Sequence, residues 1–491
     1  MTTVKSNYTG FSVPEDNASI DRVNFADITP EQFYAQYIAL RKPCIISGTL
    51  DDTQLAGTKQ WTGGYLREHA GSAELLVERR ETTQGKFGDD EKVEMTFGEL
   101  LNHLDSGSQN YYLTTQDIPF EDGIMGLFGN PMNGLSEDFP ERPRLSGNLV
   151  PQQVNMWLGA SKVGATSGLH HDFHDNIYVL LRGHKQFTLF SPDQHASMYV
   201  YGTIQDVHEN GRIVYKGDPL TRPDGLELDG KMGLTYRQRY QEYLLSKAEA
   251  ELASAKDDGD KKCIAKKESE LLLQTEKLEE IEDLLLTTAD DEDFDGGLFD
   301  EDGVAFGDSD LENKDSDSER DSGDEADESE SRSDSVPEAT VDANENSGEH
   351  PKSFSQIGTV HRDKGSICDT FPLFTHAKRM VAELSTSDAL YLPAGWFHEV
   401  TSQAASTLDT PISGSVGSKD SDDPLVTSNE NVHTALNYWF YPPDAPNYQS
   451  PYSDGLWQYM WSLRQNTAVG EKRRREREEG SVDTDTRKKA K

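Results

Sequence analysis

Residues 290–350 constrain the fold of this 491-residue chain more than any other segment. They include 25 Asp or Glu against three cationic residues, Lys314, Arg320 and Arg332, and so carry −22 of the net charge of −41. Such a segment has too little apolar surface to offset the entropy that it would lose on ordering. We therefore predict a disordered acidic insertion, and the core must be assembled from the residues on either side of it.

The charge and the cysteine pattern limit the compartment and the partners. A strongly acidic surface repels nucleic-acid phosphates and anionic lipids, which disfavours direct nucleic-acid binding and favours a basic partner. The sequence has no run of about 18 apolar residues and no apolar leader, so we expect neither membrane insertion nor secretion. Cys44, Cys263 and Cys368 form no CxxC, which argues against disulfides and a structural zinc site. An intracellular protein of the nucleus or the cytoplasm fits these features.

An α/β extension that packs on the core is expected over residues 1–145. Residues 28–46 begin with a TPE triplet typical of a helix start, continue as an amphipathic helix and end in an apolar strand. A second helix is expected over 96–104, where four apolar side chains share a face, and a strand over 111–114. Residues 115–145, rich in Pro, Gly and Asn, are expected to be loops.

Residues 146–229 and 352–441 are expected to form one β-rich barrel. Before the insertion, strands are predicted over 154–158, 176–190, 198–207 and 211–215. Arg182-Gly183-His184 divides the second of these in the manner of a hairpin turn. After the insertion, strands are predicted over 381–384, 389–392 and 433–441, with a polar loop over 402–432. The predicted fold class is α+β and mainly β.

Helices are expected outside this barrel. The insertion, residues 230–351, starts with Leu, Ala, Glu and Lys at helical spacing over 233–287, and a break at 257–260 predicts a helical hairpin. Residues 442–491 are expected to form a helix around 455–463, through which the chain could oligomerise, and a basic tail. The basic clusters of the tail, 472–475 and 487–489, suit either a nuclear import signal or a solvated end.

Three residues have the chemistry and spacing of a metal site. His170 and Asp172 lie in SGLHHDFHDN, and on an extended strand their side chains emerge on the same face. His398, which follows a strand and a Pro-Ala-Gly turn in LYLPAGWFHEV, can supply a second imidazole. Two neutral imidazoles and one carboxylate occupy one face of an octahedral Fe(II) and leave the other positions open. We predict a catalytic metal site built from these three residues.

The segments around these residues resemble the JmjC family of 2-oxoglutarate-dependent oxygenases, in the cupin-like subgroup of small protein hydroxylases. The resemblance covers about residues 28–229 and 352–441 and is sharpest at SGLHHDFHDNIYVLLRGHKQFTLFSP and ALYLPAGWFHEV. It implies a double-stranded β-helix, the jelly-roll or cupin fold, with Fe(II) as the metal, 2-oxoglutarate as co-substrate and O₂. It also implies a protein substrate, and a basic one such as a histone or a ribosome-associated protein would suit the acidic insertion.

The resemblance also implies how 2-oxoglutarate is bound. Lys185, thirteen residues after Asp172, would hold the distal carboxylate through its ammonium group. Ser167, three residues before the first metal ligand, and Tyr112, on an earlier strand, match hydroxyl groups that reach the same carboxylate. An exposed lysine in a turn is the alternative interpretation of Lys185.

Three further residues match the family pattern less specifically. Asn176 and Asn437 correspond to amides that line the co-substrate pocket, and Trp439 corresponds to an aromatic wall. For Trp439 and for Tyr112, packing in the core is an equally good interpretation, because aromatic residues on barrel strands are usually buried.

The remaining histidines of these segments are not predicted to bind the metal. His171 should point to the opposite face of its strand from His170. His174 is interpreted as a pocket or structural residue, and His184 as an exposed residue of the turn. His433 opens the last strand, and nothing in its spacing makes it a ligand.

Three functions fit the sequence. The first is hydroxylation of a side chain in a protein substrate. The second is histone lysine demethylation, since hydroxylation of an N-methyl group leads to its loss as formaldehyde; however, three cysteines cannot build an accessory zinc reader. The third is a non-catalytic cupin scaffold that binds basic partners through the acidic insertion, against which the complete triad and Lys185 argue.

Overall fold

Two facing β-sheets form the centre of the molecule. The computed structural model describes residues 6–80, 91–121, 123–161, 165–288, 350–358, 370–403 and 431–467. In order across the larger sheet, the strands are β1 (Asp21–Asn24), β2 (Cys44–Ser47), β16 (Asp388–Leu392), β11 (Asp175–Arg182), β18 (Val432–Phe440), β8 (Pro151–Ala160), β5 (Tyr111–Leu113), β3 (Glu74–Arg79) and β4 (Glu91–Thr96). The smaller sheet consists of β10 (His170–His171), β17 (Phe397–Gln403), β12 (His184–Phe190) and β15 (Met380–Ser385), with β9 (Ala165–Thr166) paired to β17. The predicted α+β class with a jelly-roll core is confirmed.

The segment 175–190 is not the hairpin that the sequence predicts. Strand β11 pairs with β16 and β18 in the larger sheet, whereas β12 pairs with β15 and β17 in the smaller one. Gly183, at φ +95°, lets the chain turn from one sheet to the other. The rings of Tyr178 and Phe187 then meet between the sheets, with centroids 5.3 Å apart. The hairpin prediction was wrong because the local pattern gives two strands but not their pairing partners.

The strands β8 and β18 separate two environments. Side chains alternate between the two faces of a strand, and on these strands the outward face is apolar. It packs against the N-terminal helices through Val154, Met156, Leu158, Leu436, Tyr438 and Phe440. The inward face carries Gln153, Asn155, Trp157, Gly159, His433, Asn437 and Trp439. Most polar residues of these strands therefore face the space between the sheets, although Thr434 alternates onto the outward face.

The N-terminal extension adds strands to both edges of the larger sheet and helices to its outer face. Helix α1 (Pro30–Phe33) begins after Thr29, whose hydroxyl accepts the Gln32 N–H, and it continues as the π-helical turn η1 (Tyr34–Ile38). Helix α3 (Phe97–Asp105) follows the cap Thr96 and buries its predicted apolar face. Helix α2 is Gly63–Ala70, and the 3₁₀ turns here are η2 (Thr49–Asp51), η3 (Thr53–Gln60), η4 (Met132–Leu135) and η5 (Arg144–Ser146).

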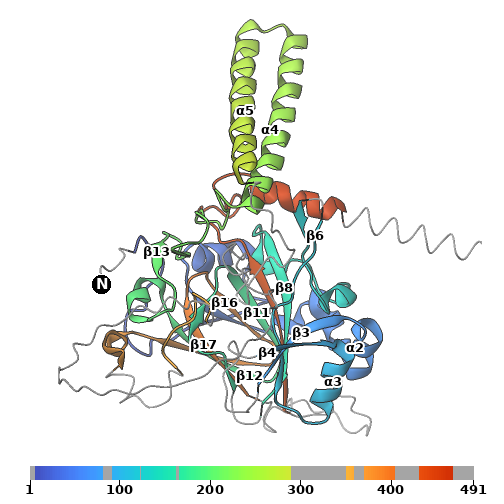
Figure 1. Cartoon of the computed structure of the whole chain (residues 1–491), viewed down its shortest axis with the longest axis vertical. Coiled ribbons are helices and arrows are strands. Elements are labelled where there is room, and N and C mark those ends of the chain that lie inside the picture. The colour runs from blue at the N-terminus through green and yellow to red at the C-terminus, as the bar shows by residue number, and fades with distance from the viewer. Residues whose placement is uncertain are drawn as a thin grey trace, which may run out of the picture.

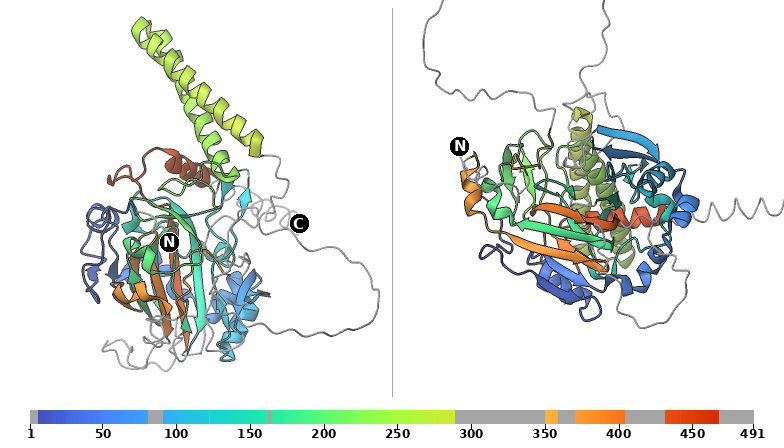
Figure 2. Two further views of the ribbon diagram at one scale, coloured as in Figure 1. Left: turned by 60° about the vertical axis from the view of Figure 1, so that its left-hand side comes forward. Right: turned by 90° about the horizontal axis from the view of Figure 1, so that it is seen from below.

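The predicted helical hairpin is present and projects from one end of the barrel (Figure 1). Helices α4 (Lys231–Asp258) and α5 (Lys261–Thr288) are joined at Gly259, whose φ of +73° ends α4. Figure 2 shows that the hairpin stands clear of the barrel along most of its length. At its base, the C-terminal helix, residues 456–467, packs on α4 through the ring pair Tyr236–Trp457. No helix among the described residues is long and apolar enough to cross a membrane.

The remaining elements are short. They are the paired strands β6 (Phe120–Glu121) and β7 (Ile124–Met125), the paired strands β13 (Ile204–Val207) and β14 (Ile213–Tyr215), and the turns η6 (Pro192–Ser197) and η7 (Pro372–His376). The strand predicted over 198–207 begins only at Ile204. The predicted acidic insertion and basic tail, and most of the predicted loop 402–432, lie outside the described residues.

Candidate active site

The three predicted metal ligands lie together on the smaller sheet. His170 on β10 pairs directly with His398 on β17, and Asp172 follows β10 by one residue. The Nε2 atom of His170 is 4.0 Å from Asp172 Oδ1, and that of His398 is 3.9 Å from Asp172 Oδ2. One ligand atom from each residue lies within 4.8 Å of the other two. Within the described ranges, no other group of three His, Cys, Asp or Glu residues comes this close together.

Backbone carbonyls fix the orientation of both imidazoles. His170 Nδ1 is 3.1 Å from the carbonyl oxygen of Gly168, and His398 Nδ1 is 3.0 Å from that of Trp396. A carbonyl oxygen can only accept, so each Nδ1 carries the proton and each Nε2 keeps a free lone pair toward Asp172. This is the arrangement in which a histidine is prepared to bind a metal.

The protonation states suit a divalent cation. Burial and the neighbouring His398 hold the pKa of His170 well below its ordinary value, so this imidazole is neutral. Burial raises the pKa of Asp172, while Asn176 and Trp439 beside it favour the charged carboxylate. A cation at this position would favour the ionised carboxylate further.

The turn before His398 is held to the segment after Asp172. The Ala394 N–H donates to Asp175 Oδ1 at 3.0 Å, and the Gly395 N–H donates to the carbonyl oxygen of Asp172 at 2.9 Å. Asp175 is fully buried and also accepts hydrogen bonds from Arg41 and from the Tyr391 hydroxyl. Because these bonds join the two segments that carry the ligands, they set the distance between His398 and Asp172.

Gly395 is required at this turn for a steric reason. Its φ of +75° lies in the left-handed region that favours glycine. A Cβ atom here would lie 1.8 Å from the carbonyl oxygen of Gly211. The Pro-Ala-Gly turn before His398 thus packs directly against the loop that contains Gly211.

A cavity of about 530 Å³, including its open mouth, extends from the triad into the barrel. Lys185, 2% exposed, lies behind two of its lining residues and donates hydrogen bonds to the hydroxyls of Tyr112, at 3.4 Å, and Ser402. No carboxylate of the described residues forms an ion pair with this ammonium, and burial lowers the pKa of Lys185 to about 7. An unpaired buried ammonium is costly, and a carboxylate ligand would remove that cost.

Ser402, which was not predicted, contacts Lys185, whereas the predicted Ser167 does not. Ser167 lines the cavity, but its hydroxyl donates to the carbonyl of Gly168 and accepts the Val400 N–H. Ser402 faces Lys185 directly across the β12–β17 pair. Strand alternation could have predicted Ser402, since His398, Val400 and Ser402 share one face of β17.

A glycine allows Tyr112 to reach the lysine. Gly159 lies between Tyr112 and His433 in one row across β5, β8 and β18. The two rings close over it with centroids 5.8 Å apart, and a Cβ atom at Gly159 would lie 2.5 Å from the Tyr112 ring. His433 does not belong to the triad, and both of its buried ring nitrogens lack a hydrogen-bond partner among the described residues.

The predicted amides lie between the sheets beside the triad. Asn176 lines the cavity, and its Oδ1 has no partner within the described part of the chain. Asn437 is fully buried in the adjacent row, opposite Asn155, and neither polar atom of its side chain has a partner there. Asn155 was not predicted, although it alternates with the apolar residues of β8. Buried amides of this kind need a ligand or water.

Trp439 and the other histidines occupy packing positions. Trp439 is 1% exposed and stacks against His174 at 5.8 Å, which favours a structural wall over direct contact with a ligand. His171 points away from the triad, as predicted, with Nε2 2.7 Å from the Tyr215 hydroxyl. His184 begins β12 and is half-buried, so the expectation of an exposed turn residue was wrong.

Phe354 contacts the metal site from beyond the insertion. Its ring stacks on His170 with centroids 4.7 Å apart and an angle of 11°. The Tyr201 N–H donates to the carbonyl oxygen of Phe354, and the Ser355 N–H donates to that of Leu169. These bonds hold the segment 350–357 next to the triad. No local pattern in the sequence indicates this contact.

Comparisons with known proteins agree with this architecture. Residues 30–445 match the family model described as a cupin-like domain. JmjC domain-containing protein 4 of Schizosaccharomyces pombe is 32% identical over 92% of this chain and 91% of its own length. The Homo sapiens bifunctional peptidase and (3S)-lysyl hydroxylase JMJD7 is 24% identical over 41% of this chain and 65% of its own length. Lysine-specific demethylase 8 of Danio rerio is 24% identical over 40% of this chain and 46% of its own length.

Proposed function

This chain belongs to the cupin-like JmjC family, and we propose that it is an Fe(II)- and 2-oxoglutarate-dependent oxygenase that hydroxylates a side chain of a protein substrate. The observation that carries the proposal is the presence of two complementary sites in one cavity. One is the triad His170, Asp172 and His398; the other is the buried Lys185, which has no ion-pair partner among the described residues and contacts the lining through Tyr112 and Ser402. A metal site alone would not specify a co-substrate, and a buried lysine alone would not specify redox chemistry.

The residues present fit the metal. His170 and His398 would bind Fe(II) through Nε2, the atom that the backbone carbonyls leave unprotonated, and Asp172 would bind it through its carboxylate. When bound, Fe(II) supplies the oxidising chemistry together with 2-oxoglutarate and O₂, and the protein supplies binding and orientation.

The residues present also fit the co-substrate. Lys185, Tyr112 and Ser402 would bind the distal carboxylate, and the Asn176 amide, which lines the same cavity, would orient the molecule. Ser167 remains a second hydroxyl on the cavity wall. Such preorganised donors lower the cost of binding a dianion in a buried site.

Two observations support a protein side chain as substrate. The names of two relatives specify lysyl hydroxylation and lysine-specific demethylation, both of which act on a lysine side chain. The acidic charge of the chain favours a basic partner over a nucleic acid. Lysine is therefore the first residue type to examine in captured substrates.

The test measures succinate release from 2-oxoglutarate by the purified full chain loaded with Fe(II). Asp172→Ala should reduce turnover to the background of the metal-free protein and should lower the bound iron. The matched control is Asp193→Ala, an exposed aspartate away from the triad, which should leave turnover unchanged. A scaffold without activity would show no turnover in any of the three proteins.

Histone lysine demethylation remains a second candidate because a demethylase is among the relatives. Mass spectrometry of proteins captured by Asp172→Ala and then treated with the active enzyme separates the two reactions. Gain of one oxygen atom supports hydroxylation, whereas loss of methyl groups alone would replace our proposal with demethylation.

A further inference from the structure

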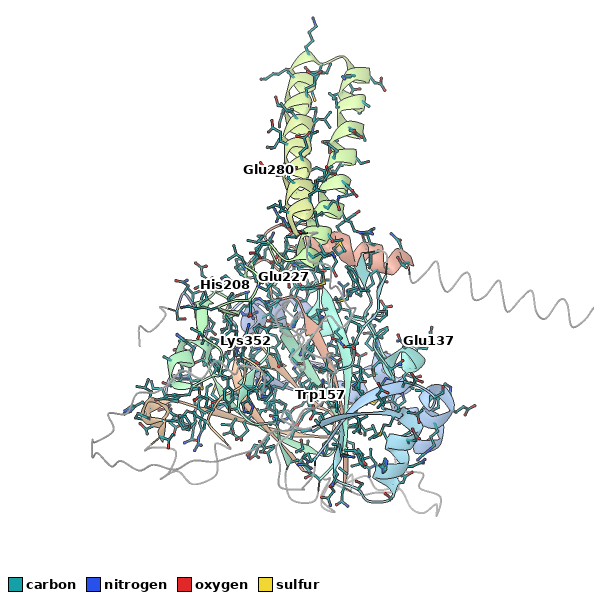
Figure 3. All side chains as sticks on the ribbon, viewed as in Figure 1. Glu137, Trp157, His208, Glu227, Glu280 and Lys352 are labelled. Carbon is teal, nitrogen blue, oxygen red and sulfur yellow. The ribbon has the colours of Figure 1, made fainter. Side chains whose placement is uncertain are left out.

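A second cavity is lined in part by Phe173 and His174, which directly follow the triad residue Asp172. It encloses about 690 Å³, including its opening, between the barrel, the first turns of α4 and the C-terminal helix. Figure 3 shows Glu227, one of its lining residues, directly below the hairpin, while Trp157 of the co-substrate cavity lies lower in the barrel. The two cavities share no lining residue.

Arg212 lines this cavity and forms no direct salt bridge with the described residues, and burial lowers its pKa to about 10, although Glu227, Asp224 and Asp218 in its surroundings partly offset this effect. Its Nη1 donates to the carbonyl oxygen of Phe173 at 2.8 Å, and its guanidinium lies 5.3 Å from the centre of the Phe173 ring. Its Nε is buried and has no acceptor, and no carboxylate of the described residues lies within ion-pair distance. A buried guanidinium without a paired anion is unfavourable unless a ligand supplies the anion.

Further unpaired polar groups line the same space. Trp457, 2% exposed, has a buried indole N–H without an acceptor. His174, 7% exposed, has a buried Nδ1 without a partner, and the Oε1 of Gln152, 1% exposed, has no donor among the described residues. The arginine and tryptophan can only donate, so these groups favour an acceptor such as an anion.

The acidic residues nearby also bind other groups, and none of them forms a direct ion pair with Arg212. Lys352 donates to Asp218 at 2.5 Å, and Glu227 accepts the Gly233 N–H at the start of α4. Their charges would repel a dianion such as a phosphate monoester but would tolerate one negative charge beside Arg212. Most of the remaining lining is apolar or aromatic and includes Leu226, Met232, Tyr236 and Tyr441.

We infer that this cavity binds a small monocarboxylic acid with an apolar or aromatic body, whose carboxylate pairs with Arg212 and accepts from the Trp457 N–H. The planar guanidinium matches a carboxylate, and the aromatic walls match the body of the ligand. A bound acid would contact both α4 and the C-terminal helix, and so it would stabilise the base of the hairpin. The inference is independent of the proposed oxygenase activity.

Isothermal titration of the metal-free full chain tests this site with phenylacetate as the probe and phenylacetamide as its uncharged counterpart. Wild type should bind phenylacetate at least about tenfold more tightly than phenylacetamide, because only the acid offers a charge-assisted hydrogen bond. Arg212→Gln should remove this preference, whereas Lys185→Ala, which alters only the other cavity, should retain it.

Trp457→Phe provides a second test if Arg212→Gln does not fold, as judged by circular dichroism and thermal unfolding. It keeps the aromatic wall, removes the donor, and should weaken phenylacetate binding severalfold. The inference is overturned if phenylacetate at about 10 mM gives no binding heat to wild type. It is also overturned if Lys185→Ala abolishes binding, since the probe would then occupy the co-substrate cavity.

Discussion

The two faces of β8 and β18 carry opposite chemistry within the same strands. On the outer face, Leu158 and Leu436 are fully buried against the N-terminal helices. On the inner face, Asn437 and His433 are equally buried, yet their polar atoms lack partners among the described residues. Side chains are equally buried on both faces. Burial stabilises the fold on the apolar outer face, whereas on the inner face it costs folding free energy.

This contrast predicts that substitutions on the two faces of β8 and β18 affect different properties, folding stability on one face and ligand binding on the other. An apolar side chain in a packed core contributes to the free energy of folding, whereas a buried unpaired amide or ammonium lowers it. The inner face is tolerated because a ligand can supply the missing partners. Substitutions on the outer face should therefore change unfolding, and those on the inner face should change co-substrate affinity.

The largest expected effect is on stability. Leu436→Ala should lower the free energy of unfolding by about 2–5 kcal/mol, since it leaves a cavity in the outer core. Urea denaturation measures this loss. The KM for 2-oxoglutarate of the folded fraction should not change, and a raised KM would contradict the separation of the two faces.

Lys185→Met should have the largest effect on the inner side. The affinity for 2-oxoglutarate should fall by roughly 10- to 100-fold, because a charge-assisted hydrogen bond is lost. At neutral pH the variant should unfold at a higher urea concentration than wild type, since an unpaired buried ammonium is removed. Unchanged affinity would remove the lysine from the co-substrate site.

The pH dependence of Lys185 provides a related test. Burial lowers its pKa in the folded chain to about 7, below the ordinary value of 10.5. Between these values the unfolded chain binds more protons, so stability should rise with pH, by at most about 1.4 kcal/mol per unit, and Lys185→Met should lose this rise. Affinity for 2-oxoglutarate should fall above pH 7, because the carboxylate needs the protonated lysine.

Gly159→Ala should change both the unfolding free energy and the KM for 2-oxoglutarate, since the glycine belongs to the inner face and also allows the side chains there to pack. The new Cβ would lie 2.5 Å from the Tyr112 ring and would displace it from Lys185. We expect a loss of about 1–3 kcal/mol in unfolding free energy and a severalfold higher KM for 2-oxoglutarate. A crystal structure with Tyr112 unmoved would contradict this explanation.

Asn437→Leu is the smallest and most selective change. The two side chains have similar shape, so replacing an unpaired buried amide should leave the stability within about 1 kcal/mol of wild type or raise it. The affinity for 2-oxoglutarate should fall severalfold. A stability loss as large as that of Leu436→Ala would show that Asn437 serves the core rather than the site.

The sequence by itself determined the features whose signals are local. The alternation in HHD placed His170 and Asp172 on one face, the helical spacing with a break at 257–260 gave the hairpin α4–α5, and Thr96 marked the start of α3. Each of these depends on the dihedral preferences and side-chain periods of neighbouring residues.

Only the tertiary structure decided what depends on distant segments. Residues 182–184 turn between two sheets, Ser402 rather than Ser167 contacts Lys185, and Phe354 covers His170 from beyond the insertion. The cavity at Arg212 likewise joins the barrel, α4 and the C-terminal helix. Local patterns specify a strand but not its partners, because pairing and cavity formation depend on long-range packing of the whole chain.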